Sequence, residues 1–112
     1  MAGMAQADLK PFTRTDFDMA LRDGKTVVLD FHANWCPTCK KQEPLLNEIT
    51  NMPGYEMVVA LKADFDKEKD LKKEFRVTKQ STIIVFKKGQ EVARKTGVTA
   101  KDELKKLIDM GL

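Results

Sequence analysis

The segment Thr26–His32 constrains the fold more than any other part of this sequence. It reads Thr-Val-Val-Leu-Asp-Phe-His, an apolar run rich in β-branched residues that holds a single carboxylate, Asp30. Continuously apolar strands are typical of parallel sheets that helices cover on both faces. The segment therefore predicts a buried central strand with an α/β fold built around it.

Strand and helix patterns alternate along the rest of the chain. The expected further strands are 56–63, 82–86 and 91–96, and the Lys88-Gly89-Gln90 turn predicts that the last two form an antiparallel hairpin. Helices are expected after Thr15, over 36–50, over 67–75 and after Thr99, where Thr15–Asp18 and Thr99–Asp102 have the spacing of capping pairs. The order predicts a central mixed sheet of four to five strands with helices on both faces.

Length and charge limit the organisation and the class of function. The chain has 112 residues and a net charge of +3. We expect residues 1–12 to be irregular, with a short edge strand near Leu9, and residues 13–112 to form one domain. The mild charge excess and the 7% of aromatic residues are not typical of a nucleic-acid-binding protein. The longest apolar run, 82–86, is too short to span a membrane.

The first residues bear on the cellular compartment. Residues 1–7 have no basic region followed by a long apolar one, so the sequence as it stands predicts a cytoplasmic protein. Ala5-Gln6-Ala7 also resembles the end of a signal-peptidase site. Removal of a signal peptide there would place the protein in the periplasm instead.

The only two cysteines, Cys36 and Cys39, lie between the central strand and the next helix. At a helix N-terminus, free backbone N–H groups and the helix dipole stabilise a thiolate. Pro37 suits the first helical position because its missing N–H is not needed there. Cys39 falls on the same helix face, within reach of a disulfide. We interpret the pair as a redox dithiol: exposed Cys36 attacks a disulfide, and the more buried Cys39 resolves the mixed disulfide.

Two other interpretations of the cysteines are weaker. A structural disulfide would close a very short loop and would constrain the unfolded chain little. A zinc site normally needs four ligands, and one chain offers two cysteines and a single histidine, His32. We therefore expect neither a metal site nor a cofactor within one chain.

Asp30 and Lys62 complete the predicted catalytic group. Burial in an apolar strand should raise the pKa of Asp30, which suits a general base that takes the proton of Cys39 through a water molecule. Lys62, in the neighbouring expected strand, is placed to pair with Asp30. Trp35 precedes the nucleophile and is expected to shield the site and contact partners, whereas His32 is predicted to be a half-buried polar residue.

These motifs together resemble the thioredoxin family. Residues 28–40 are similar to the active-site segment of the family, Pro44 matches its helix-kinking proline, and Lys62 matches the lysine that pairs with the buried aspartate. Phe86-Lys87-Lys88-Gly89 and Gly97 match the family's hairpin and the glycine that follows it. The resemblance runs from about residue 13 to the end of the chain.

The resemblance implies a thioredoxin fold with Cys36 as nucleophile, Cys39 as resolving thiol and Asp30 as buried base. It implies a thiol–disulfide oxidoreductase that acts on protein disulfides, and a reductase is favoured over an oxidant. The protein is expected to be a monomer. An upstream thiol reductant would regenerate the dithiol. One departure is Pro37-Thr38 between the cysteines, where the family has Gly-Pro.

The largest departure lies in the loop that completes the expected substrate site. The resemblance places substrate contacts at Trp35, Pro37, Gln80, Ser81 and Thr82, and Ser81 stands where the family has a cis-proline. A cis bond before serine costs about 3 kcal/mol, so the Gln80–Ser81 bond is either trans or strained. An alternative function follows: without the proline ring, two chains would share a metal ion or an iron–sulfur cluster through their four cysteines.

Overall fold

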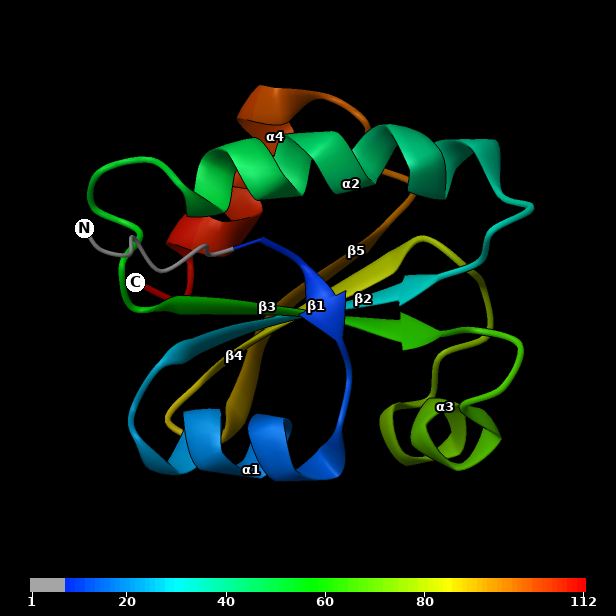
Figure 1. Cartoon of the computed structure of the whole chain (residues 1–112), viewed down its shortest axis with the longest axis horizontal. Coiled ribbons are helices and arrows are strands. Elements are labelled where there is room, and N and C mark those ends of the chain that lie inside the picture. The colour runs from blue at the N-terminus through cyan, green and yellow to red at the C-terminus, as the bar shows by residue number, and fades with distance from the viewer. Residues whose placement is uncertain (1–7) are drawn as a thin grey trace.

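The computed structural model describes residues 8–112 and has a five-stranded sheet at its centre (Figure 1). Residues 1–7, most of the segment expected to be irregular, lie outside the described residues. In chain order the elements are β1 (Lys10–Pro11), α1 (Arg14–Arg22), β2 (Thr26–His32), α2 (Pro37–Thr50), β3 (Val58–Asp64), α3 (Lys69–Phe75), β4 (Thr82–Lys87), β5 (Gln90–Thr96) and α4 (Lys101–Asp109).

The sheet is mixed, as the sequence predicts. Its strand order is β1-β3-β2-β4-β5; the first three strands run parallel to one another, and β4 and β5 are antiparallel to their neighbours. The expected hairpin of β4 and β5 is confirmed. Its turn residues Lys88 and Gly89 have φ angles of 53° and 78°, the left-handed pair that matches the twist of a two-residue hairpin.

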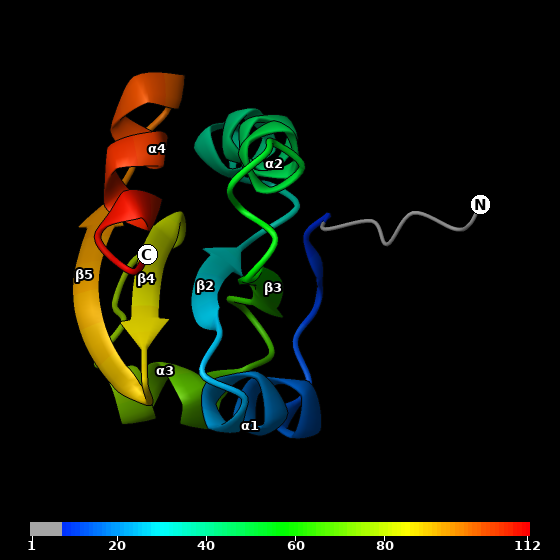
Figure 2. The same cartoon turned by 90° about the vertical axis from the view of Figure 1, so that its left-hand side faces the viewer.

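Helices cover both faces of the sheet (Figures 1 and 2). Helices α2 and α4 lie on one face, and α1 and α3 lie on the other. All seven residues of β2 are buried, and they alternate between the two cores. Val28 packs in the α2/α4 core with Leu46, whereas Leu29 and Phe31 pack in the α1/α3 core. The prediction of a central strand buried on both faces is confirmed.

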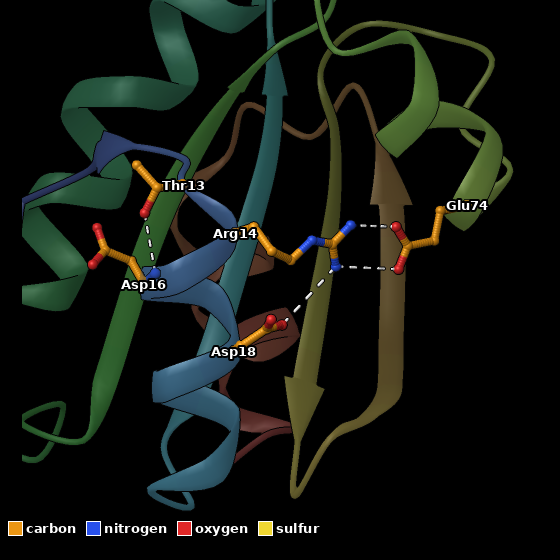
Figure 3. Close-up of polar contacts among 5 residues, drawn as sticks. All are labelled: Thr13, Arg14, Asp16, Asp18 and Glu74. Carbon is orange, nitrogen blue, oxygen red and sulfur yellow. Dashed lines mark hydrogen bonds and ion pairs between the residues drawn. The ribbon is translucent and has the colours of Figure 1, made fainter.

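The N-cap of helix α1 lies two residues earlier than the sequence predicts. The cap is Thr13, whose hydroxyl accepts the N–H of Asp16 at 3.0 Å, so the prediction of Thr15 is wrong (Figure 3). Thr13 and Thr15 are each followed three residues later by an aspartate, so the spacing alone does not distinguish them. In the structure, Thr13 has an extended backbone and caps the helix, which buries Phe17 and Ala20.

The same helix carries an exposed link to α3. The Arg14 guanidinium binds both carboxylate oxygens of Glu74 and lies 4.0 Å from Asp18 (Figure 3). All three side chains are 44–49% exposed, so the contribution of these ion pairs to stability is small. Burial of the aromatic rings of Phe17, Phe75 and Phe86, which pack edge to face, supplies more of the attachment.

Helix α4 is held by its apolar stripe rather than by a polar cap. Its N-cap is Ala100, and no side chain caps it, so the prediction of a cap from Thr99 is wrong. Leu104, Leu107 and Ile108 are buried as predicted. Within the described residues, no helix is long and apolar enough to cross a membrane.

The chain end after α4 is packed tightly against the sheet at Gly111. The Thr26 hydroxyl donates to the Gly111 carbonyl, and a Cβ atom at Gly111 would lie 2.6 Å from Thr26 Cγ2 and 2.7 Å from Val85 Cγ1. Real Cβ atoms do not approach carbon atoms this closely, so any side chain here must displace the core of β2 and β4.

We predict that Gly111→Ala lowers the free energy of unfolding by about 1–3 kcal/mol, because an added methyl group overpacks this contact. Urea unfolding measures the effect. Thr26→Ser in the Gly111→Ala background should restore part of the loss, since it removes the nearest methyl group. An unchanged urea midpoint in Gly111→Ala would contradict the packing described here.

Candidate active site

The two cysteines lie where β2 gives way to α2. Cys36 is the N-cap of α2 and Pro37 occupies the first turn, as the sequence predicts. The Cys39 N–H donates to Cys36 Sγ at 3.1 Å, and the Cys36 N–H donates to the Ala33 carbonyl at 3.1 Å. The first turn of the helix therefore directs a backbone donor at the sulfur of Cys36, where it would also bind the thiolate.

Both cysteines are free thiols, and both are buried. Cys36 is 1% exposed and Cys39 is fully buried, so the expectation of an exposed Cys36 is wrong. At the N-cap position the Cys36 side chain lies over the end of the helix, where it packs with Ala33, Cys39 and Phe65. Trp35 is 57% exposed instead, and its indole N–H donates to Asp66 at 2.8 Å.

The two thiols have different surroundings. Burial raises the pKa of the Cys39 thiol to about 12, and the hydrogen bond with Cys36 and the nearby charge of Asp30 act in the same direction. Cys39 is therefore held as a thiol at neutral pH and needs a base before it can attack.

Asp30 lies in β2 on the same face as Val28, under helix α2. It is fully buried, and neither of its carboxylate oxygens has a hydrogen-bond partner among the described residues. The pKa of Asp30 is raised to about 7, mainly by burial and also by the charge of Glu43, while the charge of Lys62 acts in the opposite direction. A carboxyl that titrates near neutrality, close enough to influence Cys39, is suited to exchange a proton with that thiol.

Lys62 is opposite Asp30 in the β2–β3 register, but its ammonium binds elsewhere. Lys62 Nζ lies 3.1 Å from Glu43 Oε2, and His32 Nε2 lies 3.4 Å from Glu43 Oε1. The expected ion pair between Lys62 and Asp30 is therefore wrong. The Lys62 ammonium instead pairs with Glu43, which lies one turn beyond Cys39 on α2. Burial and the charge of Lys62 lower the pKa of His32.

Glu43 is a residue that the sequence interpretation missed. The signal was present, because Glu43 follows Cys39 by four residues and so projects from the same side of the helix. A glutamate there offers a carboxylate to any cation on the strands below.

The loop before β4 is built without a cis bond. None of the peptide bonds in residues 8–112 is cis, so the Gln80–Ser81 bond is trans, and Ser81 has a φ angle of 63°. The Ser81 N–H donates to the Phe31 carbonyl at 2.7 Å, and the Ser81 carbonyl accepts the Gly97 N–H at 3.1 Å. These bonds fix the loop against the end of β2, a few residues before the cysteines.

Gln42 is the second residue that the sequence interpretation missed. It is fully buried in α2, three residues beyond Cys39. Its amide nitrogen donates to the carbonyls of Ser81 and Val98 at 3.3 and 2.9 Å. The available signal in the sequence was the position of Gln42, a polar residue at helical spacing from Cys39 and Leu46 on the apolar side of the helix.

The described residues hold no cluster of three or more histidine, cysteine or acidic side chains that fits a metal ion. A cluster shared between two chains would need both thiols at the surface, whereas Cys36 and Cys39 are buried. The metal-bridged alternative is therefore not favoured.

The comparisons with known proteins agree on one family. The family model described as thioredoxin matches residues 8–110. The chain is 34% identical to thioredoxin-1 of Saccharomyces cerevisiae over 85 residues, which are 76% of this chain and 81% of that protein. It is 40% identical to a thioredoxin of Chlamydia muridarum over 82 residues, which are 73% of this chain and 78% of that protein.

Solved structures agree with the fold. The crystal structure of Trxlp from Edwardsiella tarda has a TM-score of 0.86 and 35% identity, and the match covers 90% of this chain and 98% of that one. Together with a CxxC dithiol at the N-terminus of α2, these matches mean that this chain belongs to the thioredoxin family and is a thiol–disulfide oxidoreductase.

Proposed function

We propose that the chain is a protein-disulfide reductase in which Cys36 attacks, Cys39 resolves and Asp30 carries the proton. The free dithiol at the N-terminus of α2, with an unpartnered buried carboxyl beneath it, is the observation that supports this most directly. No histidine stands between the cysteines to stabilise the thiolate further. A less stabilised reduced form gives a more reducing couple, which favours reduction over oxidation of substrates.

The reaction transfers two electrons in two displacements. The Cys36 thiolate attacks one sulfur of the substrate disulfide; the S–S bond breaks, and the other substrate sulfur leaves as a thiolate. Cys39 then loses its proton to the Asp30 carboxylate through a water molecule and attacks Cys36 Sγ. The mixed disulfide breaks, the second substrate thiolate leaves, and the chain holds the Cys36–Cys39 disulfide.

Burial sets the role of Asp30. A base matched to neutral pH must be neither fully ionised nor fully protonated there, and the pKa of Asp30 is raised to about 7. Lys62 and Glu43 tune this value from opposite directions through their charges. We therefore assign Lys62 an electrostatic role that does not need direct contact with Asp30.

The substrate is expected to dock on the surface around the dithiol. Trp35 and Pro37 are exposed on either side of Cys36. Ser81 and Thr82 are each 4% exposed, so their contribution comes through the backbone rather than through their side chains. Gln80 is half-buried and lies directly before them.

A thiol reductant must return the oxidised chain to the dithiol. A relative from Mycobacterium leprae is named bifunctional thioredoxin reductase/thioredoxin; it is 38% identical to this chain over 88 residues, which are 19% of its own length. That name supports an enzymatic reductant of the thioredoxin reductase kind for this chain.

The order of the two cysteines is tested with insulin as the protein disulfide. We expect Cys39→Ser to accumulate a mixed disulfide with insulin that dithiothreitol releases, and to lose turnover by at least about a hundredfold. Cys36→Ser should form no mixed disulfide, because the attacking sulfur is gone. Non-reducing mass spectrometry identifies the adduct. Equal trapping by both variants would contradict the assigned roles.

The Asp30 assignment predicts how stability depends on pH. Folding raises the pKa of Asp30 from 3.8 to about 7, so the folded state favours the protonated acid. The contribution of Asp30 to stability is therefore largest below about pH 4 and is lost as pH rises towards 7, where the folded protein must bury a charge. We expect Asp30→Asn to stabilise the reduced protein by about 4 kcal/mol at pH 8 and to have little effect at pH 4.

Urea unfolding at the two pH values measures this difference, and exposed Asp70→Asn is the matched control, expected within about 0.5 kcal/mol of wild type at both. Asp30→Asn should also slow insulin reduction at pH 7, because Cys39 loses its base. An Asp30→Asn variant that is less stable at pH 8 and equally active would sink the assignment.

A further inference from the structure

Gln42 connects helix α2 to two loops near the active site, the one that holds Ser81 and the one that holds Val98. It projects from α2 in the turn that follows Cys39, and it is fully buried. One amide nitrogen donates to the carbonyl of Ser81, before β4, and to the carbonyl of Val98, between β5 and α4. Helix α2, the loop before β4 and the loop after β5 are thus joined through a single side chain.

The amide oxygen of Gln42 shows that this arrangement also destabilises the protein. Gln42 Oε1 is buried and has no hydrogen-bond partner among the described residues. An unsatisfied buried oxygen destabilises a protein, and an apolar side chain of similar volume would avoid it. Packing alone therefore does not explain a glutamine at this position, whereas its two donated hydrogen bonds do.

The backbone conformation of Ser81 is the feature that these hydrogen bonds stabilise. Ser81 adopts a left-handed φ of 63°, which is costly for a residue with a Cβ atom, and it has no proline ring to restrict the loop. Its carbonyl accepts hydrogen bonds from both Gln42 and Gly97, and its N–H donates to Phe31. These hydrogen bonds restrain the Ser81 backbone, which in the family is restrained by a proline ring.

The loop held in this way offers free backbone groups to a substrate. Within residues 8–112, neither the N–H nor the carbonyl of Gln80 has a hydrogen-bond partner. Gln80 directly precedes Ser81, which is anchored to the strand before the cysteines and to the helix after them. An extended peptide segment that flanks a disulfide has the main-chain donors and acceptors to pair with it.

We propose that Gln42 is a positioning residue for protein substrates: it locks the Ser81 and Val98 loops so that the Gln80 backbone meets an extended segment beside the substrate disulfide. This inference rests on the proposed reductase function. It assigns Gln42 no contact with the reacting sulfurs, so its effect falls on substrate binding rather than on the chemical step.

The kinetic test is Gln42→Met, which keeps the length of the side chain and removes both donors. With insulin as substrate, we expect KM to rise about tenfold while kcat changes by less than about twofold. The selectivity for insulin over glutathione disulfide, which has little chain to pair, should fall by a similar factor. Gln90→Met, the same change at an exposed position in β5, should leave all three quantities at wild-type values.

A change in kcat with an unchanged KM, or no change in either, would overturn the positioning role. The Ser81→Gly background separates positioning from a general loss of packing, because glycine adopts the left-handed φ of this position without strain and keeps the N–H that binds Phe31, so the loop no longer depends on Gln42. There, Gln42→Met should alter KM by less than about twofold. An equal rise in KM in both backgrounds would show that Gln42 does not act through the Ser81 loop.

Hydrogen exchange tests the lock without any enzyme activity. The Gly97 N–H donates to the Ser81 carbonyl, so loosening the loop should expose it. We expect its exchange in Gln42→Met to be about tenfold faster than in wild type and in Gln90→Met. Unchanged Gly97 exchange overturns the lock. Inactive wild-type protein with faster Gly97 exchange in Gln42→Met would instead contradict the reductase function and leave the lock standing.

Discussion

Burial of β2 between two cores determines where the chemistry lies. Its side chains alternate between the α2/α4 core and the α1/α3 core, so the strand is fixed in register from Thr26 to His32. The chain leaves the sheet beyond His32 and enters α2 at Pro37, which places Cys36 at the N-cap. The same burial places Asp30 beneath the helix with no hydrogen-bond partner among the described residues, and burial raises the pKa of its carboxyl to about 7.

One turn of α2 beyond Cys39 organises both sides of this site. Gln42 faces the loops that carry Ser81 and Val98, and Glu43 faces the strands, where it binds Lys62 and contacts His32. Neighbouring residues on a helix point about 100° apart, so a single turn reaches two surroundings of the dithiol. In our account, the first residue serves substrate docking and the second sets the charge felt by Asp30.

The sequence was sufficient for features that follow from strong local patterns. A single structural interpretation fitted the sequence pattern of the buried strand, of the β4–β5 hairpin and of the helix that begins at the cysteines. It was insufficient where local patterns were equivalent, as with Thr13 and Thr15, or where a long side chain had several partners in reach, as with Lys62. The buried state of Cys36 and the donors of Gln42 depend on contacts between distant segments, which spacing does not encode.

The central claim is that Cys36 and Cys39 form a reversible, reducing dithiol. Its most direct test is the equilibrium of this pair against a series of dithiothreitol redox buffers at pH 7, followed by mass spectrometry after alkylation. The account predicts a single two-electron transition at a potential between about −300 and −230 mV, in the range of reducing members of this fold. A midpoint above about −180 mV, or thiols that show no reversible transition, would contradict it.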